Sequence, residues 1–292
     1  MAFSLIHVSD LHFGGVADIA QIEAFEALVP DLEPEAIVIS GDVSQRARHG
    51  EFQRARALVR ELGRTAPVYL IPGNHDVQWW WRPFMPASPS RKYEKYRRYF
   101  GEELVPVLEL PQALIVGVLT AHGVSWGSLT PRLKDIAVKG HLPKAEIDRA
   151  RDRFALALPD QVRILVVHHN VMRGQLSHRM GLARWKTAQE RIAASGADLV
   201  LCGHDHQESI DTLGDTVVVC AGTLSTRSRG RRAPVFNRIV MEDNAIQIVQ
   251  YRWDAALKVF RRSDQHQLVR ARRPLPPPAS VADAPSSESE HG

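Results

Sequence analysis

Short runs of apolar residues recur along this 292-residue chain, and five of them end in histidine, aspartate or asparagine. Buried strands of a parallel sheet read as such runs, and residues directly after them gather at the carboxyl edge of the sheet. The pattern therefore favours a fold in which several strand ends meet at one place. The five polar clusters are Asp10-Leu11-His12, Gly41-Asp42, Gly73-Asn74-His75-Asp76, His168-His169 and Gly203-His204-Asp205-His206.

Apolar, β-branched runs alternate with helix-like stretches through most of the chain, which predicts an α/β fold. The strands that we expect are 3–8, 36–40, 68–71, 113–120, 163–167, 198–202, 216–221, 236–241 and 245–253. The helices that we expect are 19–28, 51–62, 144–156 and 186–194. The last two strands have no helix between them, so an antiparallel part is added to the α/β layers.

Composition and termini set the domain boundaries that we expect. Residues 1–260 read as one domain, and residues 274–292 as a disordered tail, because that segment is rich in Pro, Ala and Ser and poor in large apolar side chains. The basic stretch 261–273 is either the end of the fold or a solvated arm.

The two cysteines and the N-terminus bear on the compartment. Cys202 and Cys220 lie inside apolar runs and read as buried strand residues without a disulfide. The N-terminus has no signal-peptide pattern, and no apolar run is long enough to span a membrane. We therefore expect a cytoplasmic protein with no membrane partner. A homo-oligomer is left open. The net charge of +4 suits phosphate-bearing substrates, and it permits nucleic acid without favouring it.

The polar clusters together supply a complete set of ligands for two metal ions. Carboxylates, an amide and imidazoles suit Mn, Fe, Co or Zn. Two divalent ions about 3.5–4 Å apart can clamp a phosphoryl group and activate water, provided that one carboxylate bridges them. Each cluster alone could be an ordinary turn or a pair of solvated side chains. Their ordered co-occurrence favours a two-metal hydrolase.

These motifs resemble the signature of the calcineurin-like metallophosphoesterases, which runs Asp-x-His, Gly-Asp, Gly-Asn-His-(Asp/Glu), His and Gly-His-x-His. The resemblance covers about residues 3–253 and implies two packed mixed β-sheets flanked by helices. It also implies that Asp42 bridges two metal sites. One ion would be held by Asp10, His12, Asp42 and His206, and the other by Asp42, Asn74, His168 and His204, with His169 next to the ligands.

The resemblance further implies a mechanism and a cofactor. His75 is similar to the family's catalytic histidine, and Asp76 would orient its ring. A metal-bridging hydroxide would attack phosphorus in line, without a phospho-enzyme. The cofactor would be two divalent transition-metal ions, with Mn or Fe favoured. In the purple acid phosphatase branch a tyrosine follows the Gly-Asp motif by three residues; here that residue is Gln45, so a ferric ion is not expected.

The substrate that the resemblance favours is a small nucleotide-like phosphodiester, such as a 3′,5′-cyclic nucleotide. Class III cyclic-nucleotide phosphodiesterases typically read His-His-Pro-Pro where this chain reads His168-His169-Asn170-Val171, and this difference weakens the cyclic-nucleotide assignment. A broad-specificity phosphomonoesterase is nearly as well supported. A DNA nuclease and a non-catalytic scaffold that keeps the fold are the remaining alternatives.

Three further groups of residues are candidates for substrate binding. Trp79, Trp80 and Trp81 follow the Gly-Asn-His-Asp motif and begin a candidate lid or interface, 79–100. Tyr93, Tyr96 and Tyr99 lie at helical spacing, which favours a satellite hydrophobic cluster over a lid. The other candidates are His169 and the pair Arg227 and Arg229, whose guanidinium groups suit phosphate oxygens.

Overall fold

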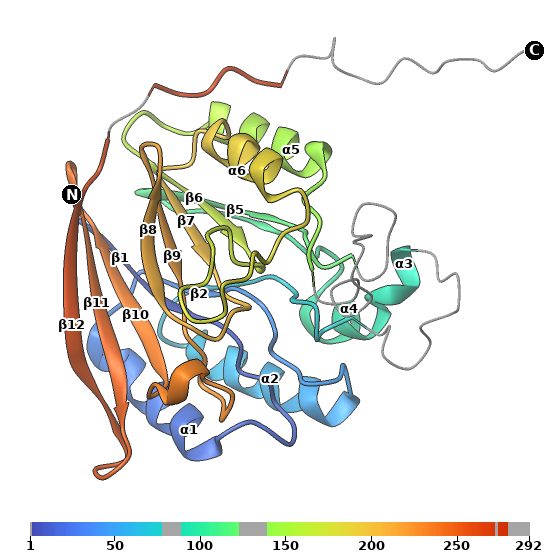
Figure 1. The fold of residues 1–292 in the computed structure, drawn as a ribbon, viewed down its shortest axis with the longest axis vertical. Coiled ribbons are helices and arrows are strands. Elements are labelled where there is room, and N and C mark those ends of the chain that lie inside the picture. Colours follow the sequence, from blue (N-terminus) through green and yellow to red (C-terminus); the bar gives the residue numbers. More distant parts are fainter. Residues whose placement is uncertain (1, 78–88, 123–138, 272–273, 280–292) are drawn as a thin grey trace, which may run out of the picture.

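The fold is a sandwich of two mixed β-sheets with helices on both outer faces, which confirms the predicted architecture. The computed structural model describes residues 2–77, 89–122, 139–271 and 274–279. Figure 1 shows α1 and α2 below one sheet, and α5 and α6 above the other.

The first sheet has the strand order β12-β11-β10-β1-β2-β3. In it, β1 pairs in parallel with β2 and antiparallel with β10. Two of the ligand clusters therefore follow neighbouring parallel strands, β1 and β2. The strands are β1 (Phe3–Val8), β2 (Ala36–Ile39), β3 (Val68–Leu70), β10 (Val235–Met241), β11 (Ala245–Asp254) and β12 (Val259–Val269).

The second sheet has the strand order β4-β5-β6-β7-β9-β8. Its inner strands β5, β6, β7 and β9 are parallel, so the clusters after β6 and β7 also lie at one edge. The strands are β4 (Val107–Glu109), β5 (Ala113–Val118), β6 (Val162–Val167), β7 (Leu199–Cys202), β8 (Ser209–Leu213) and β9 (Thr216–Cys220).

Three apolar layers hold the sandwich together. Alternate side chains of β1 point into different layers: Leu5 packs between the two sheets, whereas Ile6 packs against the helices that cover the first sheet. The helices on the first sheet are α1 (Ile19–Leu28) and α2 (His49–Leu62), with a 3-10 turn at Val29–Leu32; α4 (Glu94–Phe100) packs on α2 and is preceded by the short α3 (Pro89–Lys92). The helices on the second sheet are α5 (Lys144–Ala155) and α6 (Trp185–Ala193). Because both sheets are covered on both faces, most side chains of the inner strands are apolar.

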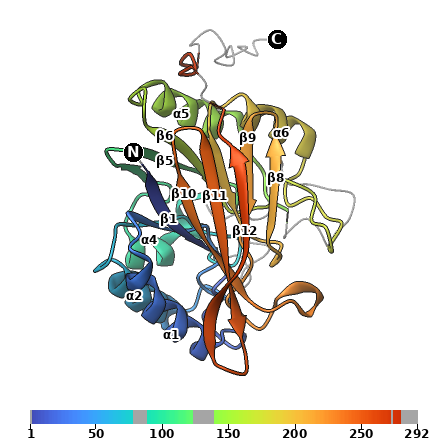
Figure 2. The same cartoon turned by 90° about the vertical axis from the view of Figure 1, so that its left-hand side faces the viewer.

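Three strands, β4, β8 and β12, were not predicted from the sequence. Each lies at the edge of a sheet, where strands need no continuous apolar run. The longest of them, β12, is exposed along almost its whole length, and Figure 2 shows it at the outer side of its sheet. Most of the basic stretch 261–273 is thus the end of the fold and not a solvated arm.

The start of the predicted tail is tied to the domain. Arg163 Nη1 donates to the carbonyl oxygen of Pro274 at 3.0 Å, and Arg151 Nε donates to that of Pro277 at 2.7 Å. Pro276 is buried against Gly196. Within the predicted tail, residues 274–277 thus contact the domain. Residues 280–292 lie outside the described part of the chain.

The cysteines have the surroundings that the sequence predicts. Cys202 and Cys220 are buried and form no disulfide, as predicted. They lie opposite each other on the neighbouring strands β7 and β9. Among the described residues, no helix is long and apolar enough to cross a membrane.

The tyrosines of the candidate lid segment pack into the core. Tyr93 and Tyr96 are buried, and Tyr99 is partly buried in the same cluster. The Tyr96 ring lies 4.8 Å from that of Phe100 and 6.1 Å from that of Phe52 on α2, measured between centroids. The hydrophobic-cluster interpretation of this stripe is confirmed, and α4 is anchored on α2.

We expect Tyr96→Ala to lower the free energy of unfolding by about 3–5 kcal/mol, because truncation of a buried ring leaves a cavity. Tyr96→Phe should leave it unchanged or raise it slightly, because the hydroxyl has no hydrogen-bond partner among the described residues. Urea denaturation measures both variants. A loss with Tyr96→Phe as large as with Tyr96→Ala would show that the hydroxyl, and not the ring, holds α4.

Candidate metal centre

The loops that carry the predicted ligands share an unusual backbone conformation. Five of the seven predicted metal ligands have positive φ angles: Asp10 (56°), His12 (48°), Asp42 (52°), His204 (72°) and His206 (54°). Such a conformation costs an L-residue on the order of 1–3 kcal/mol and is found where a site imposes it. Here it turns the chain sharply after each strand, so that the side chains converge.

Two glycines in these loops leave space that a side chain would fill. A Cβ atom on Gly41, whose φ is 105°, would lie 2.5 Å from Nδ1 of His168. A Cβ atom on Gly73 would overlap the carboxylate of Asp42. Glycine is therefore required at 41 for the loop after β2 to approach the loop after β6, and at 73 for the loop after β3 to approach the loop after β2.

The first group of ligand atoms comes from Asp10, His12 and His206. Asp10 Oδ1 lies 3.2 Å from Nε2 of His206 and 3.6 Å from Nε2 of His12. The two imidazole Nε2 atoms are 2.9 Å apart. His206 Nδ1 is held by the carbonyl oxygen of Arg227 at 3.1 Å. The three side chains thus direct one oxygen and two nitrogens at a single point, and the motif resemblance assigns all three, with Asp42, to one ion.

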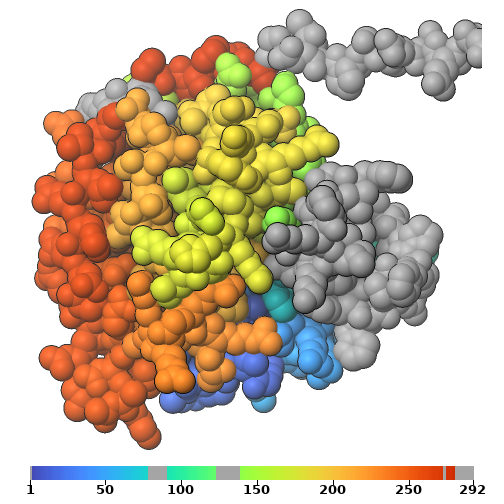
Figure 3. Space-filling model, viewed as in Figure 1, coloured from blue at the N-terminus to red at the C-terminus, as the bar shows by residue number. Residues whose placement is uncertain are grey.

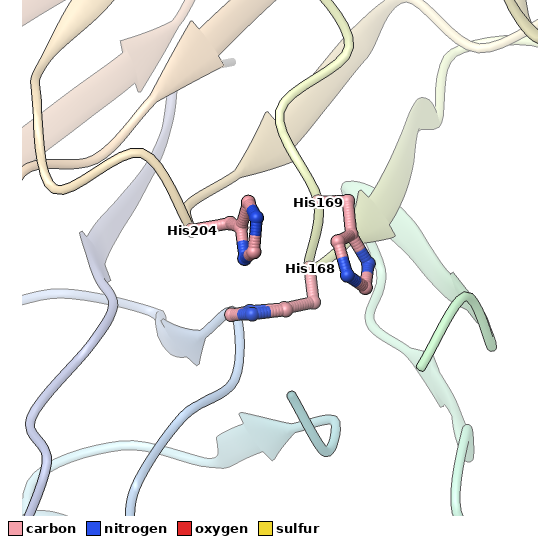
Figure 4. Close-up of side chains that lie close together, drawn as sticks. All are labelled: His168, His169 and His204. Carbon is pink, nitrogen blue, oxygen red and sulfur yellow. The ribbon is translucent and has the colours of Figure 1, made fainter. Parts of the chain in front are cut away.

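The second group comes from Asn74, His168 and His204. Asn74 Oδ1 lies 3.1 Å from Nε2 of His168 and 2.9 Å from Nδ1 of His204. Figure 4 shows the rings of His168 and His204 with that of His169 beside them. The other ring nitrogen of His168, Nδ1, lies 2.9 Å from the carbonyl oxygen of Ser40, so this ring is fixed at both ends.

His169 also lies in this cluster, with its ring centroid 4.5 Å from that of His204. Its Nδ1 is 2.8 Å from Oγ1 of Thr120, and Gly140 packs against the ring. By contrast, it is His168 whose Nε2 faces Asp42. We therefore keep His168 as the proposed ligand and His169 as its neighbour.

One carboxylate oxygen joins the two groups. Asp42 Oδ2 lies 3.3 Å from Nε2 of His168 and 3.8 Å from Nε2 of His12. The other oxygen, Oδ1, accepts a hydrogen bond from the backbone amide of His75 at 2.8 Å. Asp42 therefore stands between the two ligand groups, in the place that the sequence predicts for a bridging residue.

His75 lies next to the first group, and its ring is oriented differently from our prediction. Its centroid is 4.8 Å from that of His12, with the rings perpendicular. Nδ1 donates to the backbone carbonyl of Gln45 at 2.8 Å, which places the proton on Nδ1. The prediction that Asp76 orients this ring is therefore wrong, and the Gln45 carbonyl does so.

Asp76 instead joins two loops. Its buried carboxylate accepts hydrogen bonds from the backbone amides of Gly73, Val43 and Ser44, and from the hydroxyl of Ser44. A buried carboxylate needs several donors, and backbone amides supply them here. Asp76 thus fixes the loop of Asn74 and His75 to the loop of Asp42, and it acts on the site through the backbone.

Sequence reasoning missed the groups that hold the imidazoles, because most of them are backbone carbonyls. The carbonyl oxygens of Ser40, Gln45 and Arg227 hold His168, His75 and His206 in turn. A backbone carbonyl has no residue-type signature, so no motif could reveal it. Thr120 could have been suspected only from its position after β5.

The site favours charged carboxylates. Burial alone would raise the pKa of Asp42, but His168 and His75 hold it well below its usual range. Burial alone would also raise the pKa of Asp10. The interactions with His206 and His12 outweigh burial and lower the pKa of Asp10 below its usual range. Burial lowers the pKa of His204 to about 3, so its imidazole is neutral. Two carboxylates and a neutral imidazole are the forms that metal binding requires.

The donor atoms fit a pair of divalent ions. Asp10 Oδ1 is fully buried and, among the described residues, faces only the two imidazoles of His12 and His206 without a well-formed hydrogen bond, which is costly unless a cation meets it. The two Nε2 atoms of His12 and His206 face each other and can share only one proton. Mixed carboxylate, amide and imidazole donors suit Mn, Fe, Co or Zn. Residues of both groups thus offer lone pairs that ions would satisfy.

The predicted substrate residues have mixed outcomes. Trp79, Trp80 and Trp81 lie outside the described residues. Arg229 Nε donates to the carbonyl oxygen of Asp205 at 2.5 Å and lies 3.1 Å from its Oδ1. Arg227 meets the site through its carbonyl oxygen. The structure thus gives both arginines contacts with the His204–His206 loop, and their binding of phosphate stays a prediction.

Comparison with known proteins decides the family. The sequence model described as calcineurin-like phosphoesterase matches residues 3–208. The chain belongs to the calcineurin-like phosphoesterase family. This family uses a binuclear divalent-metal site for metal-dependent hydrolysis of phosphoesters, and the histidine and aspartate clusters described above are of that kind.

Individual relatives of this calcineurin-like phosphoesterase are distant. It is 34% identical over 87 residues to glycerophosphodiester phosphodiesterase GpdQ of Enterobacter lignolyticus (strain SCF1), a match that spans 25% of this chain and 29% of that protein. A dimetal phosphatase from Danio rerio shares the fold with a TM-score of 0.61 at 11% identity, over 92% of this chain and 99% of that one. Purple acid phosphatase PPD1 from yellow lupin (Lupinus luteus) seeds has a TM-score of 0.64 at 11% identity, over 92% of this chain and 54% of that one.

Proposed function

We propose that this calcineurin-like phosphoesterase is a phosphodiesterase that acts on small nucleotide-like diesters. The observation that carries its hydrolytic chemistry is the position of Asp42 Oδ2 between His12 and His168, because it couples two ligand groups through one oxygen. The partial similarity to GpdQ, a glycerophosphodiester phosphodiesterase, supports the choice of a diester.

Each described side chain has a part in this proposal. Asp10, His12, His206 and Asp42 would hold one ion, and Asp42, Asn74, His168 and His204 the other. When bound, such ions supply Lewis acidity toward phosphoryl oxygens and activate water as the nucleophile. The protein fixes the ligands through the carbonyl groups of Ser40 and Arg227, so little reorganisation is needed at the moment of reaction.

His75 would act as the general acid that protonates the leaving oxygen. The Gln45 carbonyl accepts a hydrogen bond from Nδ1–H, so the ring would protonate the leaving oxygen from Nε2, which requires that both ring nitrogens carry a proton beforehand. The backbone amide of His75 donates a hydrogen bond to Oδ1 of Asp42, which fixes the residue relative to both ligand groups. A proton given to the departing alkoxide lowers the barrier most when that alkoxide is strongly basic.

A panel of four substrates tests this proposal. We expect turnover of bis-p-nitrophenyl phosphate and 3′,5′-cyclic AMP with added Mn²⁺, slower turnover of p-nitrophenyl phosphate and duplex DNA, and none with chelator. Ordering by kcat/KM separates diester from monoester preference. Preference for the monoester or for DNA would keep the metal chemistry and overturn the substrate class. No turnover with Mn²⁺, Fe²⁺, Co²⁺ or Zn²⁺ would favour a scaffold.

A further inference from the structure

A cationic pocket lies beside the candidate metal centre, and we name it the β6–α6 pocket. It has a volume of about 610 Å³ and lies along the segment that joins β6 to α6. Its charged and polar lining residues are Lys139, Arg173, His178, Arg179 and Gln189, with Trp185 as its aromatic residue. The motifs of the metal centre do not include any of these side chains.

The β6–α6 pocket and the metal centre share a wall. Gly140, next to Lys139, packs directly on the ring of His169 and bonds to the backbone of Gly181 and Ala183. Met172, which also lines the pocket, follows His169 by three residues. Lys139 of the pocket is thus linked to the proposed ligand His204 through Gly140 and the ring of His169.

The charge of the pocket selects an anion. Residues 170–189 contain three arginines, one lysine and no aspartate or glutamate. None of the described residues that line the pocket is acidic. Arg173 Nε donates to the carbonyl oxygen of His178 at 3.0 Å, which fixes that arginine. Arg179 is exposed, and its guanidinium donates no hydrogen bond to the described residues, so it is available to a ligand.

The apolar part of the pocket suits a flat ring. Trp185, at the first position of α6, is 40% exposed, which is unusual for so large an apolar side chain. Met172 and Met180 add flexible apolar contacts. Tryptophan can stack on any nucleobase, and a volume of this order suits a ligand of nucleotide size.

The segment that lines the pocket is fastened to the metal-ligand loop by Asp205. This residue lies between His204 and His206, and its carboxylate accepts a hydrogen bond from Ser177 Oγ at 2.9 Å and pairs with Arg229. Figure 3 shows residues near 175 in yellow-green next to residues near 230 in orange, and Leu176 contacts Gly230 there. The position of the pocket is thus fixed relative to the ligands.

We propose that the β6–α6 pocket binds the non-reacting arm of the substrate, and that this arm is a nucleotide with its own phosphate. Arg179 would meet the terminal phosphate, and Trp185 would stack on the base. The inference rests on the proposed function and narrows it to linear dinucleotides that end in a phosphate. A glycerol or choline arm is too small or carries the wrong charge for this pocket.

Kinetics with three diesters test the proposal. The substrates are a dithymidylate with a 5′-phosphate, the same dinucleotide without it, and bis-p-nitrophenyl phosphate. For Arg179→Gln we expect the KM of the phosphorylated dinucleotide to rise about tenfold, with the other two KM values unchanged. For Trp185→Ala we expect the KM values of both dinucleotides to rise about tenfold and the KM of bis-p-nitrophenyl phosphate to stay unchanged. Arg261→Gln on the edge strand β12 is the matched control, since Arg261 is exposed far along the chain from the pocket.

A binding measurement separates the pocket from the catalytic proposal. We expect thymidine 5′-monophosphate to bind the chelator-treated protein in calorimetry, and Arg179→Gln to weaken that binding about tenfold while Arg261→Gln does not. If wild-type protein hydrolyses no diester but binds the nucleotide in this way, the proposed function fails and the pocket stands. If diesters are hydrolysed but neither variant changes KM or binding, the pocket inference is overturned. Equal losses on all three diesters would also overturn it, since a selective pocket cannot affect bis-p-nitrophenyl phosphate.

Discussion

Asp42→Asn is expected to reduce turnover of bis-p-nitrophenyl phosphate at least about 10³-fold. The reason is geometric. Asp42 Oδ1 already accepts the amide hydrogen of His75, so an asparagine keeps its oxygen there and directs its NH₂ group at His12 and His168. An amide nitrogen cannot serve as a metal ligand, and the bridging negative charge is lost.

The loss should appear in metal content as well as in rate. We expect elemental analysis of Asp42→Asn, loaded with Mn²⁺ and desalted, to show fewer bound ions per chain than wild type. Asp215→Asn is the matched control, because Asp215 lies in the exposed turn between β8 and β9. Circular dichroism should show both variants folded. Turnover of Asp42→Asn within a few-fold of wild type would sink the assignment of Asp42 as the bridging ligand.

The sequence predicts the inner strands and the ligand clusters because burial constrains them. Strands β1, β2, β6 and β7 are buried along their whole length, so most of their side chains are apolar, and the pattern is readable. The edge strands β8 and β12 carry no such constraint. Their residues, Ser-Ile-Asp-Thr-Leu in β8 for example, resemble loops, and long-range pairing with neighbouring strands makes them strands.

The residues of the candidate metal centre likewise differ in how well the sequence predicts them. Side chains that must supply a lone pair to a metal are limited to a few residue types, so Asp10, His12 and His204 could be recognised. The groups that orient them are under no such limit. Asp76 illustrates the difference: a carboxylate beside a histidine in sequence suggests an orienting partner, yet local geometry turns it toward the amides of Ser44 and Gly73. Although His75 and Asp76 are neighbours in sequence, their side chains have different partners.

The β6–α6 pocket could not have been predicted from the sequence. Arg179 and Trp185 read as surface residues of a loop and a helix start, and their distance in sequence from Lys139 hides the fact that they line one cavity. The backbone contacts of Gly140 with Gly181 and Ala183 bring the two segments together. Loops of this kind are specified by a few hydrogen bonds rather than by an apolar pattern.

His75→Asn is expected to slow the chemical step without removing the metal ions, and the size of the loss should depend on the leaving group. An asparagine is close to the imidazole in size but cannot give a proton at neutral pH. A nucleoside alkoxide is a poor leaving group and needs that proton, so we expect kcat for a dinucleotide to fall about 10³-fold. Nitrophenolate is a stable anion, so bis-p-nitrophenyl phosphate should lose only about tenfold.

Metal content and a matched control complete this test. His75 belongs to neither of the two proposed ligand sets, so the Mn²⁺ content of His75→Asn should equal that of wild type. The control is His49→Asn, since His49 lies at the start of α2 and its Nδ1 contacts only Tyr99 among the described hydrogen bonds. Loss of bound metal in His75→Asn would make His75 a ligand. Equal losses on both substrates, with metal retained, would show that the imidazole stabilises the phosphoryl charge and does not protonate the leaving oxygen.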